Sequence, residues 1–253
     1  MMLKNKRILI AGLANKHSIA AGIAKAMSAQ GAELAFTYQS ERLKGNVEKI
    51  ANELGSTLLF ECDVASDESI DAMYKDLSNH WKTFDGFVHS IGFAPANELE
   101  GNFVDASTRE GFRIAHDISS YSFTAMAKGA KPMLNPNSAL LTLTYLGSMQ
   151  SLPNYNVMGL AKASLEAISR SMAIEFAPQG IRTNCIQAGV TDTTSLQMIP
   201  NYEQLKENAL NRNPFNDLTT PQKVADVVYL LSKKEASWIN GTVIKVDGGE
   251  SLQ

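Results

Sequence analysis

The segment Arg7–Gly22 organises this sequence, and its residues are RILIAGLANKHSIAAG. A short apolar run, Arg7–Gly12, ends in a glycine, and an amphipathic segment begins at Ser18. This pattern predicts a buried strand followed by a helix whose first turn is capped by the serine. A helix that starts directly after a strand offers free N–H groups and the positive end of its dipole to a pyrophosphate. The spacing of Gly12 and Gly22 differs from the common G-x-G-x-x-G, so an ordinary strand–helix turn remains the alternative.

Apolar runs and amphipathic segments alternate along the whole chain. Strands are predicted at Arg7–Gly12, Ala32–Tyr38, Thr57–Cys62, Gly86–Ser90, Ala139–Tyr145, Arg182–Ala188 and Val243–Val246. Helices are predicted at Ser18–Gln30, Glu41–Leu54, Ser69–Trp81, Arg109–Lys128, Tyr155–Ala177 and Pro221–Leu231. This alternation indicates a parallel sheet with helices on both faces. We therefore expect an α/β fold, a single-domain (residues 1–253) Rossmann-like doubly wound parallel sheet of about seven strands.

One segment interrupts the alternation. Val190–Phe215 contains Thr, Asp, Asn and Pro residues and only weak helical periodicity. It follows the sixth predicted strand at its carboxyl end, where doubly wound folds bind their ligands, and long connections at such places are usually functional. We expect an irregular segment, residues 190–215, that serves as a substrate lid.

The charge balance and the cysteines limit the possible partners and compartment. Lys and Arg total 23 and Asp and Glu total 26, giving a formal net charge of -3, which argues against a nucleic-acid partner. Cys62 and Cys185 both lie in apolar runs, so we expect reduced core thiols and a cytoplasmic protein. No apolar run approaches the length of a membrane span, so no membrane partner is expected.

The histidines do not predict a metal site. None of them has the spacing of a metal-ligand set, and packing or surface roles account for them; they are His17, His80, His89 and His116. We therefore expect no metal.

Polar residues and glycines follow the successive predicted strands. Gln39 ends the second predicted strand, at the position where this type of fold contacts the adenosine ribose. Asp63 and Val64 end the third strand, where an acid and backbone groups could hold the adenine, and Ile91 precedes a glycine at the end of the fourth. A neutral amide at Gln39 neither repels a 2′-phosphate nor binds it strongly, so NADH is expected to be preferred, with some use of NADPH.

Tyr155 and Lys162 suggest a catalytic pair. Seven residues turn a helix by about 700°, so the two side chains project toward nearly the same face, about 10 Å apart along the axis. A lysine beside a bound cofactor can donate to ribose hydroxyls, and its charge favours the ionised phenol. Taken alone, such a pair is more often a core-edge aromatic and a solvated charge. Tyr145 also lies at the carboxyl end of a predicted strand.

Several segments closely resemble one family, the bacterial enoyl-acyl-carrier-protein reductases of the NADH-dependent type, in the short-chain dehydrogenase/reductase superfamily. The matching residues are Gly12 with Ser18–Ala20, Phe36–Gln39, Cys62–Val64, His89–Pro95, Ile114–Ser122 and Tyr145 with Tyr155–Lys162. Most of the superfamily has its tyrosine four residues before the lysine, where this chain has Met158. The tyrosine at Tyr155 resembles the enoyl reductases instead and weakens a ketoreductase interpretation.

The resemblance implies roles for particular residues. Hydride from NADH would reach the β-carbon of a trans-2-enoyl thioester, and Tyr155 would donate to the thioester oxygen while Lys162 held the nicotinamide ribose. Tyr145 would line the acyl pocket with a lesser catalytic part, and Ala94 would contact substrate. The cofactor contacts implied are Gly12, Ser18, Ile19, Gln39, Asp63, Val64, Ile91, Lys162, Thr191, Asp192 and Thr193. The partner implied is an acyl carrier protein bearing the enoyl thioester, and the assembly implied is a homotetramer built on the two long helices.

The carboxyl third departs from the family pattern. After the sixth predicted strand this chain has Val190-Thr191-Asp192-Thr193. The NADH-dependent type of enoyl reductase, the first type of the family, usually has Pro-Ile-x-Thr there. Leu196–Arg212 looks more like the third, NADPH-using type of bacterial enoyl reductase. Two other functions remain as alternatives: reduction of another small enone or carbonyl, and redox sensing by a dinucleotide-binding protein without turnover. The Tyr155/Lys162 pair argues against a sensor, which would not need it.

Overall fold

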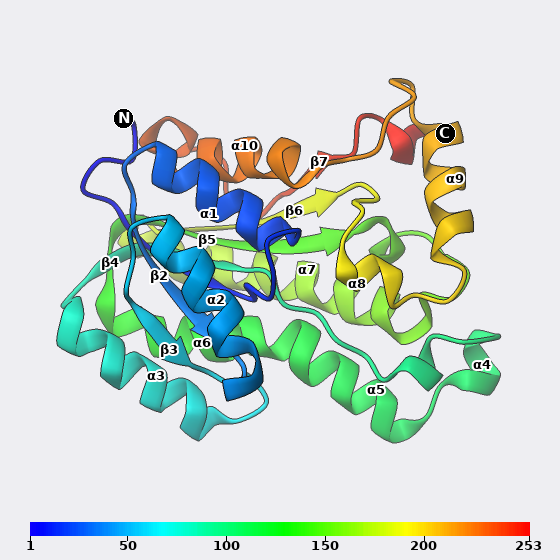
Figure 1. The fold of residues 1–253 in the computed structure, drawn as a ribbon, viewed down its shortest axis with the longest axis horizontal. Coiled ribbons are helices and arrows are strands. Elements are labelled where there is room, and N and C mark those ends of the chain that lie inside the picture. Colours follow the sequence, from blue (N-terminus) through cyan, green and yellow to red (C-terminus); the bar gives the residue numbers. More distant parts are fainter.

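The computed structural model describes residues 1–253 and has one seven-stranded parallel sheet at its centre (Figure 1). The spatial order is β3-β2-β1-β4-β5-β6-β7, and every neighbouring pair is parallel. The strands are β1 (Arg7–Ala11), β2 (Glu33–Tyr38), β3 (Leu59–Glu61), β4 (Phe84–His89), β5 (Leu134–Tyr145), β6 (Arg182–Ala188) and β7 (Val243–Val246). The predicted Rossmann-like sheet of seven strands is therefore confirmed.

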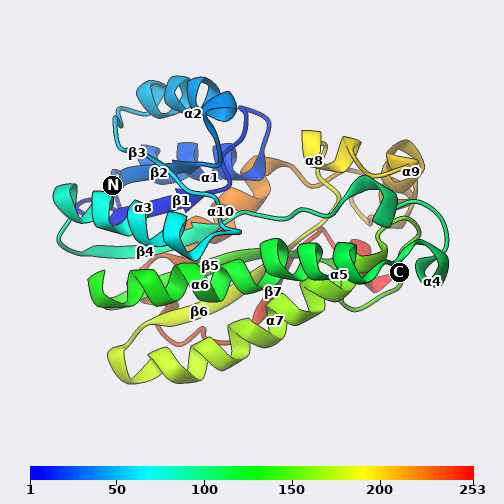
Figure 2. The same cartoon turned by 90° about the horizontal axis from the view of Figure 1, so that it is seen from below.

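Helices cover both faces of the sheet (Figure 1 and Figure 2). One face carries α1 (Ile19–Ala29), α2 (Glu41–Glu53) and α10 (Pro221–Leu231). The other carries α3 (Asp67–His80), α6 (Ser122–Ala130) and α7 (Asn156–Phe176). The remaining helices are α4 (Phe103–Ala106), α5 (Arg109–His116), α8 (Thr194–Gln197) and α9 (Tyr202–Arg212).

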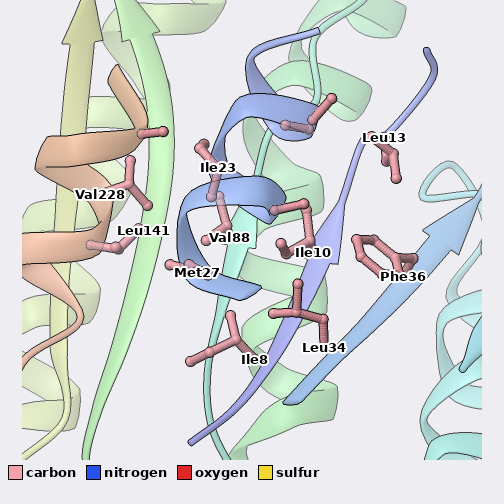
Figure 3. Close-up of a cluster of buried hydrophobic side chains, with 14 of the residues drawn as sticks. Ile8, Ile10, Leu13, Ile23, Met27, Leu34, Phe36, Val88, Leu141 and Val228 are labelled. Atoms are coloured by element: carbon pink, nitrogen blue, oxygen red, sulfur yellow. The ribbon is translucent and has the colours of Figure 1, made fainter. Parts of the chain in front are cut away.

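The two faces of the sheet have separate hydrophobic cores because successive side chains of a strand point in opposite directions. In β1, Ile8 and Ile10 pack beneath α1, whereas Leu9 and Ala11 face the core of α3, α6 and α7. Figure 3 shows the first of these cores, where Ile23 and Met27 of α1 lie above the sheet. Burial on both sides explains why the strands appear in the sequence as continuous apolar runs.

The strand order reverses at β1, which has β2 on one side and β4 on the other. Chains leaving β1 and β4 diverge there and open a crevice at the carboxyl ends. Gly12 leaves β1 with φ +94 and lies so close to the Ser90 carbonyl that a Cβ would overlap it. Glycine is required at this point by both the conformation and the close approach.

The helix predicted at Arg109–Lys128 is interrupted. It consists of α5, a π-helical turn at Asp117–Tyr121, and α6. Within this region Ser122 Oγ donates to the Ile118 carbonyl at 2.6 Å and lies 2.8 Å from His89 Nε2. The other ring nitrogen, Nδ1, lies 3.0 Å from Thr142 Oγ1, so both nitrogens of His89 have a hydroxyl partner. Burial lowers the pKa of His89 to about 3, so the ring is neutral.

The segment Val190–Phe215 is more regular than expected. It contains α8 and α9, so the expectation of irregular chain was wrong for these residues. Only Ala209 of α9 is buried, which explains why the helical periodicity of that segment is weak. Strand β5 begins at Leu134, five residues earlier than predicted. The prediction missed this start because Asn135, Pro136 and Asn137 resemble a turn in the sequence, and Asn137 does have a positive φ.

The two cysteines are buried and unpaired, as predicted. Burial raises the pKa of Cys62 to about 12 and that of Cys185 to about 11, so both remain thiols at neutral pH. Among the helices, none is both long and apolar enough to span a membrane.

Two helical glycines test whether close packing holds α1 in place. A Cβ on Gly22 would lie 2.8 Å from Cβ and O of Pro221 in α10, whereas a Cβ on Gly45 in α2 would meet nothing within 4 Å. Alanine favours a helix over glycine by about 1 kcal/mol. We expect Gly45→Ala to raise the free energy of unfolding by up to about 1 kcal/mol, and Gly22→Ala to lower it by roughly 1–3 kcal/mol through overpacking. Denaturant unfolding would measure both, and a Gly22→Ala protein as stable as Gly45→Ala would contradict the α1–α10 contact.

Candidate active site

A cavity of about 440 Å³ opens at the carboxyl ends of β4, β5 and β6, in the crevice beside the order reversal. Most of its lining is apolar. The start of α1, the first turns of α7 and the short helix α8 complete the wall. Eight of the residues singled out in the sequence line it: Ile19, Ile91, Ala94, Tyr145, Tyr155, Lys162, Thr191 and Thr193.

Tyr155 is the residue immediately before α7, and its ring is almost completely buried. The ring packs edge-on against Tyr145, with centroids 5.1 Å apart and planes at 72°. On the other side it lies against Gly147, where any Cβ would overlap the ring. Burial, with a smaller contribution from Tyr145, raises the pKa of Tyr155 well above its ordinary value, so the phenol stays protonated at neutral pH. A protonated phenol in an apolar cavity is a hydrogen-bond donor.

Lys162 lies about two turns further along α7 and is also buried. Its ammonium donates to the Leu143 carbonyl of β5 at 2.9 Å and to the Ile91 carbonyl after β4 at 3.4 Å. These bonds use two of its three N–H groups, which leaves one for a ligand. Burial lowers the pKa of Lys162 to about 8, since charge is costly away from water.

Tyr145, the last residue of β5, lies between Tyr155 and the segment that follows β6. It packs against Tyr155 on one side and against the apolar cluster of Val190, Leu196 and Ala209 on the other. Its hydroxyl is buried without a hydrogen-bond partner. Burial, followed by the negative charge of Glu250, raises the pKa of Tyr145.

The residues expected to hold the adenosine half lie outside this cavity, at the carboxyl ends of β1, β2 and β3. Ser18 caps α1 as predicted, because its Oγ accepts from Ala21 N at 3.2 Å. Gln39 is exposed after β2, and Val64 is buried after β3. Asp63 accepts from Ala65 N at 3.1 Å. Together with Gly12 they form a row of strand ends that leads away from the cavity.

The three residues Thr191, Asp192 and Thr193 do not act as a unit. Thr191 and Thr193 line the cavity, and Thr193 caps α8 by accepting from Leu196 N. Asp192 is exposed, does not line the cavity and forms an ion pair with Lys206 of α9 at 3.0 Å. Asp192 therefore contacts Lys206 within residues 190–215 and does not face the cavity.

Several lining residues were not identified from the sequence. Phe93 and Met158 line the cavity, as do Leu196 and Ile199 of the lid. Ser119 of the π-helical turn bonds Phe93 twice: it accepts from Phe93 N at 2.8 Å and donates to Phe93 O at 2.9 Å. The only signal for this was the hydroxyl-rich run Ser119–Ser122 on what is otherwise a buried helix face.

The arrangement combines a neutral donor, a buried cation and an apolar cavity beside a nucleotide-type crevice. A substrate oxygen that gains negative charge could accept from Tyr155, and Lys162 could hold a polyol such as ribose. The free N-terminus of α1, the glycine at the β1 exit and the spare N–H of Lys162 fit a dinucleotide across the strand ends.

Comparisons with known proteins agree with this geometry. The family model described as "Enoyl-(Acyl carrier protein) reductase" matches residues 12–251. The chain is 53% identical to the enoyl-acyl-carrier-protein reductase (NADH) FabI of Salmonella typhimurium over 250 residues, 99% of this chain and 95% of that protein.

Two solved structures of such reductases have very similar folds. The enoyl-acyl-carrier-protein reductase (NADH) of Aquifex aeolicus has a TM-score of 0.97 and 41% identity, covering 100% of this chain and 99% of that one. The corresponding reductase of Anaplasma phagocytophilum, solved in complex with NAD, has a TM-score of 0.94 and 36% identity, covering 100% and 94%.

The pKa of Lys162 predicts opposite pH responses of cofactor binding and stability. Deprotonation removes the ammonium, so NADH affinity should fall as pH rises through about 8. The folded-state pKa lies below the ordinary value of 10.5, so between these two values the unfolded chain binds more protons and stability should rise with pH. Fluorescence titration of NADH and denaturant unfolding across this range would measure the two. Lys162→Met is the control, which should bind NADH weakly and without this pH dependence; a pH-independent wild-type affinity would contradict the role of the ammonium.

Proposed function

This chain belongs to the enoyl-acyl-carrier-protein reductase family of the short-chain dehydrogenase/reductases, and we propose which of its residues perform the reaction. It is an NADH-dependent oxidoreductase of fatty acid synthesis that reduces the trans-2 double bond of enoyl thioesters. When bound, NADH supplies the hydride that is added to the β-carbon. The proposals below concern the individual residues, the partner, the assembly and the compartment.

Tyr155 is the hydrogen-bond donor to the thioester oxygen. As hydride reaches the β-carbon, electron density moves onto that oxygen, and a donor already in place stabilises it without reorganisation. The observation that carries this assignment is the buried Tyr155 ring between Tyr145 and Gly147, with a phenol that stays protonated. Lys162 holds the nicotinamide ribose through its remaining N–H and keeps a positive charge beside the site.

The other cofactor contacts follow the strand ends. Ser18 and Ile19 bring the N-terminus of α1 to the pyrophosphate, and Gly12 allows the backbone to approach it. Gln39 meets the adenosine ribose, while Asp63 and Val64 hold the adenine. At the nicotinamide end the cofactor contacts are Ile91, Thr191 and Thr193. Asp192 contributes to cofactor binding only indirectly, through its ion pair with Lys206.

The acyl chain occupies the apolar part of the cavity. Ala94 and Tyr145 contact it, and residues 190–215 of this single-domain chain form the lid, with Leu196 and Ile199 facing the substrate. The substrate arrives on an acyl carrier protein, so that protein is the macromolecular partner. Neither nucleic acid nor membrane is needed, and the proposed compartment is the cytoplasm.

The assembly proposed is a homotetramer built on the two long helical segments, α5–α6 and α7. Both expose large apolar side chains that a second copy would cover: Phe112, Tyr121, Leu160 and Ile174. Sedimentation equilibrium would test the state of assembly, and a monomer at micromolar concentration would contradict it.

The family match favours the enoyl thioester reductase over two alternatives: reduction of a different small enone or carbonyl, and redox sensing without turnover. Loss of NADH absorbance with a crotonyl thioester distinguishes the reductase from a sensor. The same assay with simple ketones separates it from a carbonyl reductase.

Removing the Tyr155 hydroxyl tests its catalytic role. We expect Tyr155→Phe to lower kcat by roughly 10²–10³-fold, about 3 kcal/mol of barrier, as for other single oxyanion donors. The cavity hardly changes in shape, so NADH affinity should stay near that of the wild type. Steady-state kinetics with crotonyl thioester measure the effect, and Tyr145→Phe is the matched control that should cost less. A Tyr155→Phe rate within about twofold of wild type is too fast for a lost oxyanion donor.

The surroundings of Gln39 predict how the cofactor preference could be changed. Lys44, the next lysine along the chain, is paired with Glu41 at 2.8 Å, so its positive charge toward a 2′-phosphate is partly offset. Replacing Gln39-Ser40 by Arg-Lys should shift the ratio of kcat/KM toward NADPH by supplying that charge. The measurement is kcat/KM for both cofactors with one enoyl thioester at fixed salt. If the ratio does not move, Gln39 does not face the ribose.

A further inference from the structure

The base of the lid is held by an ion pair between a partly exposed guanidinium and a buried carboxylate, which the catalytic proposal does not use. Arg212, the last residue of α9, donates through Nη2 to Glu250 Oε1 at 3.0 Å. Glu250 is only 3% exposed, although it lies three residues from the last residue, Gln253, in a Gly-Gly-Glu-Ser sequence. Every other ion pair of the protein has at least one partner that is substantially exposed, and none has a partner buried this deeply.

Glu250 also binds the chain where it leaves β6. Its Oε2 accepts from the backbone N–H of Val190 at 3.2 Å, just before the cavity residue Thr191. One carboxylate therefore joins the two ends of the lid, since Val190 is at its start and Arg212 near its end. A second contact supports the same junction, because Asn213 Nδ2 donates to the Asp247 carbonyl at 2.9 Å.

Tyr145 lies at this junction too. Glu250 and Arg212 are the charged groups that act on its hydroxyl, which is buried and unpartnered. Three more buried polar atoms nearby in the chain also lack partners: Arg212 Nε, Asp247 Oδ2 and Ser251 Oγ. Apolar contacts from Val190, Leu196 and Ala209 complete the surroundings of the ring.

The part of the lid that faces the cavity has no comparable attachment. Met198 is largely exposed, and the ion pair between Asp192 and Lys206 lies at the surface. Exposed ion pairs contribute little, whereas breaking an ion pair with a buried carboxylate leaves an uncompensated charge and is costly. The lid is thus held at its base by a charged contact, and at α8 by the apolar contacts of Leu196 and a hydrogen bond from Asn15 Nδ2 to Thr194 Oγ1 at 3.2 Å.

We propose that Glu250 and Arg212 are positioning residues of the reductase site: their ion pair sets the base of the lid, the Val190–Thr191 turn and the Tyr145 ring relative to the acyl pocket. This inference rests on the proposed role of residues 190–215 as lid. Neither residue touches the reacting atoms, so their effect should fall on substrate binding more than on the chemical step.

Glu250→Gln is the principal variant, because the amide keeps an acceptor for Val190 N–H but loses the charge that holds Arg212. We expect KM for the enoyl thioester to rise about tenfold, with kcat and NADH affinity changing less than about threefold. Amide hydrogen exchange of residues 194–212, followed without substrate, should become faster. Arg212→Met should have a similar effect, and Arg212→Lys should restore part of it because the charge returns.

The double variant and a control show whether the pair acts as a unit. Arg212→Met with Glu250→Gln should raise KM by clearly less than the product of the two single effects. Glu175→Gln is the matched control, since Glu175 pairs with Lys131 at 2.7 Å on the surface, away from the lid, and should change neither KM nor exchange.

The outcomes separate the inference from the proposed function. Faster hydrogen exchange with an unchanged KM would make the ion pair merely structural and overturn its positioning role. If neither hydrogen exchange nor KM changes, the positioning role is overturned as well. A loss of melting temperature in Glu250→Gln without the KM change counts in the same way. Failure of the wild type to reduce any enoyl thioester would instead overturn the proposed function, and the positioning role with it.

Discussion

The ammonium group of Lys162 is bound to two strand ends at once, and the site depends on this contact. It donates to carbonyls after β4 and in β5, which ties α7 to the sheet beside the point where the strand order reverses. Because α7 is a rigid helix, the same contact fixes Tyr155 at its start. A cation buried this deeply is costly, which lowers the pKa of Lys162, and the anionic cofactor of the family offsets that cost when it binds.

Glycines and hydroxyl groups make room for this arrangement. Gly147 leaves space for the Tyr155 ring, and Gly12 allows the exits of β1 and β4 to meet. Ser119 in the π-helical turn fixes both backbone groups of Phe93, and its hydroxyl lies 3.5 Å from Met158 Sδ of α7. π-Helical turns are often found at functional sites, and this one places the Ser119 hydroxyl against Phe93 in the cavity wall.

The proposed lid is held differently at its two parts. Its base is joined to the β6 exit and the carboxyl-terminal turn through Glu250, while Leu196 of α8 and Ile199 just after it line the cavity. The segment is part of the fold shared with the family, since the match to the Aquifex aeolicus reductase covers the whole chain.

The sequence alone predicted the parallel sheet, the helices that cover its two faces and the Ser18 cap, since these depend on local periodicity and capping chemistry. The family resemblance singled out Tyr155 and Lys162, which the structure places in one cavity. The sequence did not predict the π-helical turn, the helices of the lid or the outward contact of Asp192. Nothing local marks them: Ser119 acts through Phe93, and Asp192 through Lys206 fourteen residues away. Only the tertiary structure buries Glu250 against Arg212, because burial of a near-terminal carboxylate is decided by what packs over it.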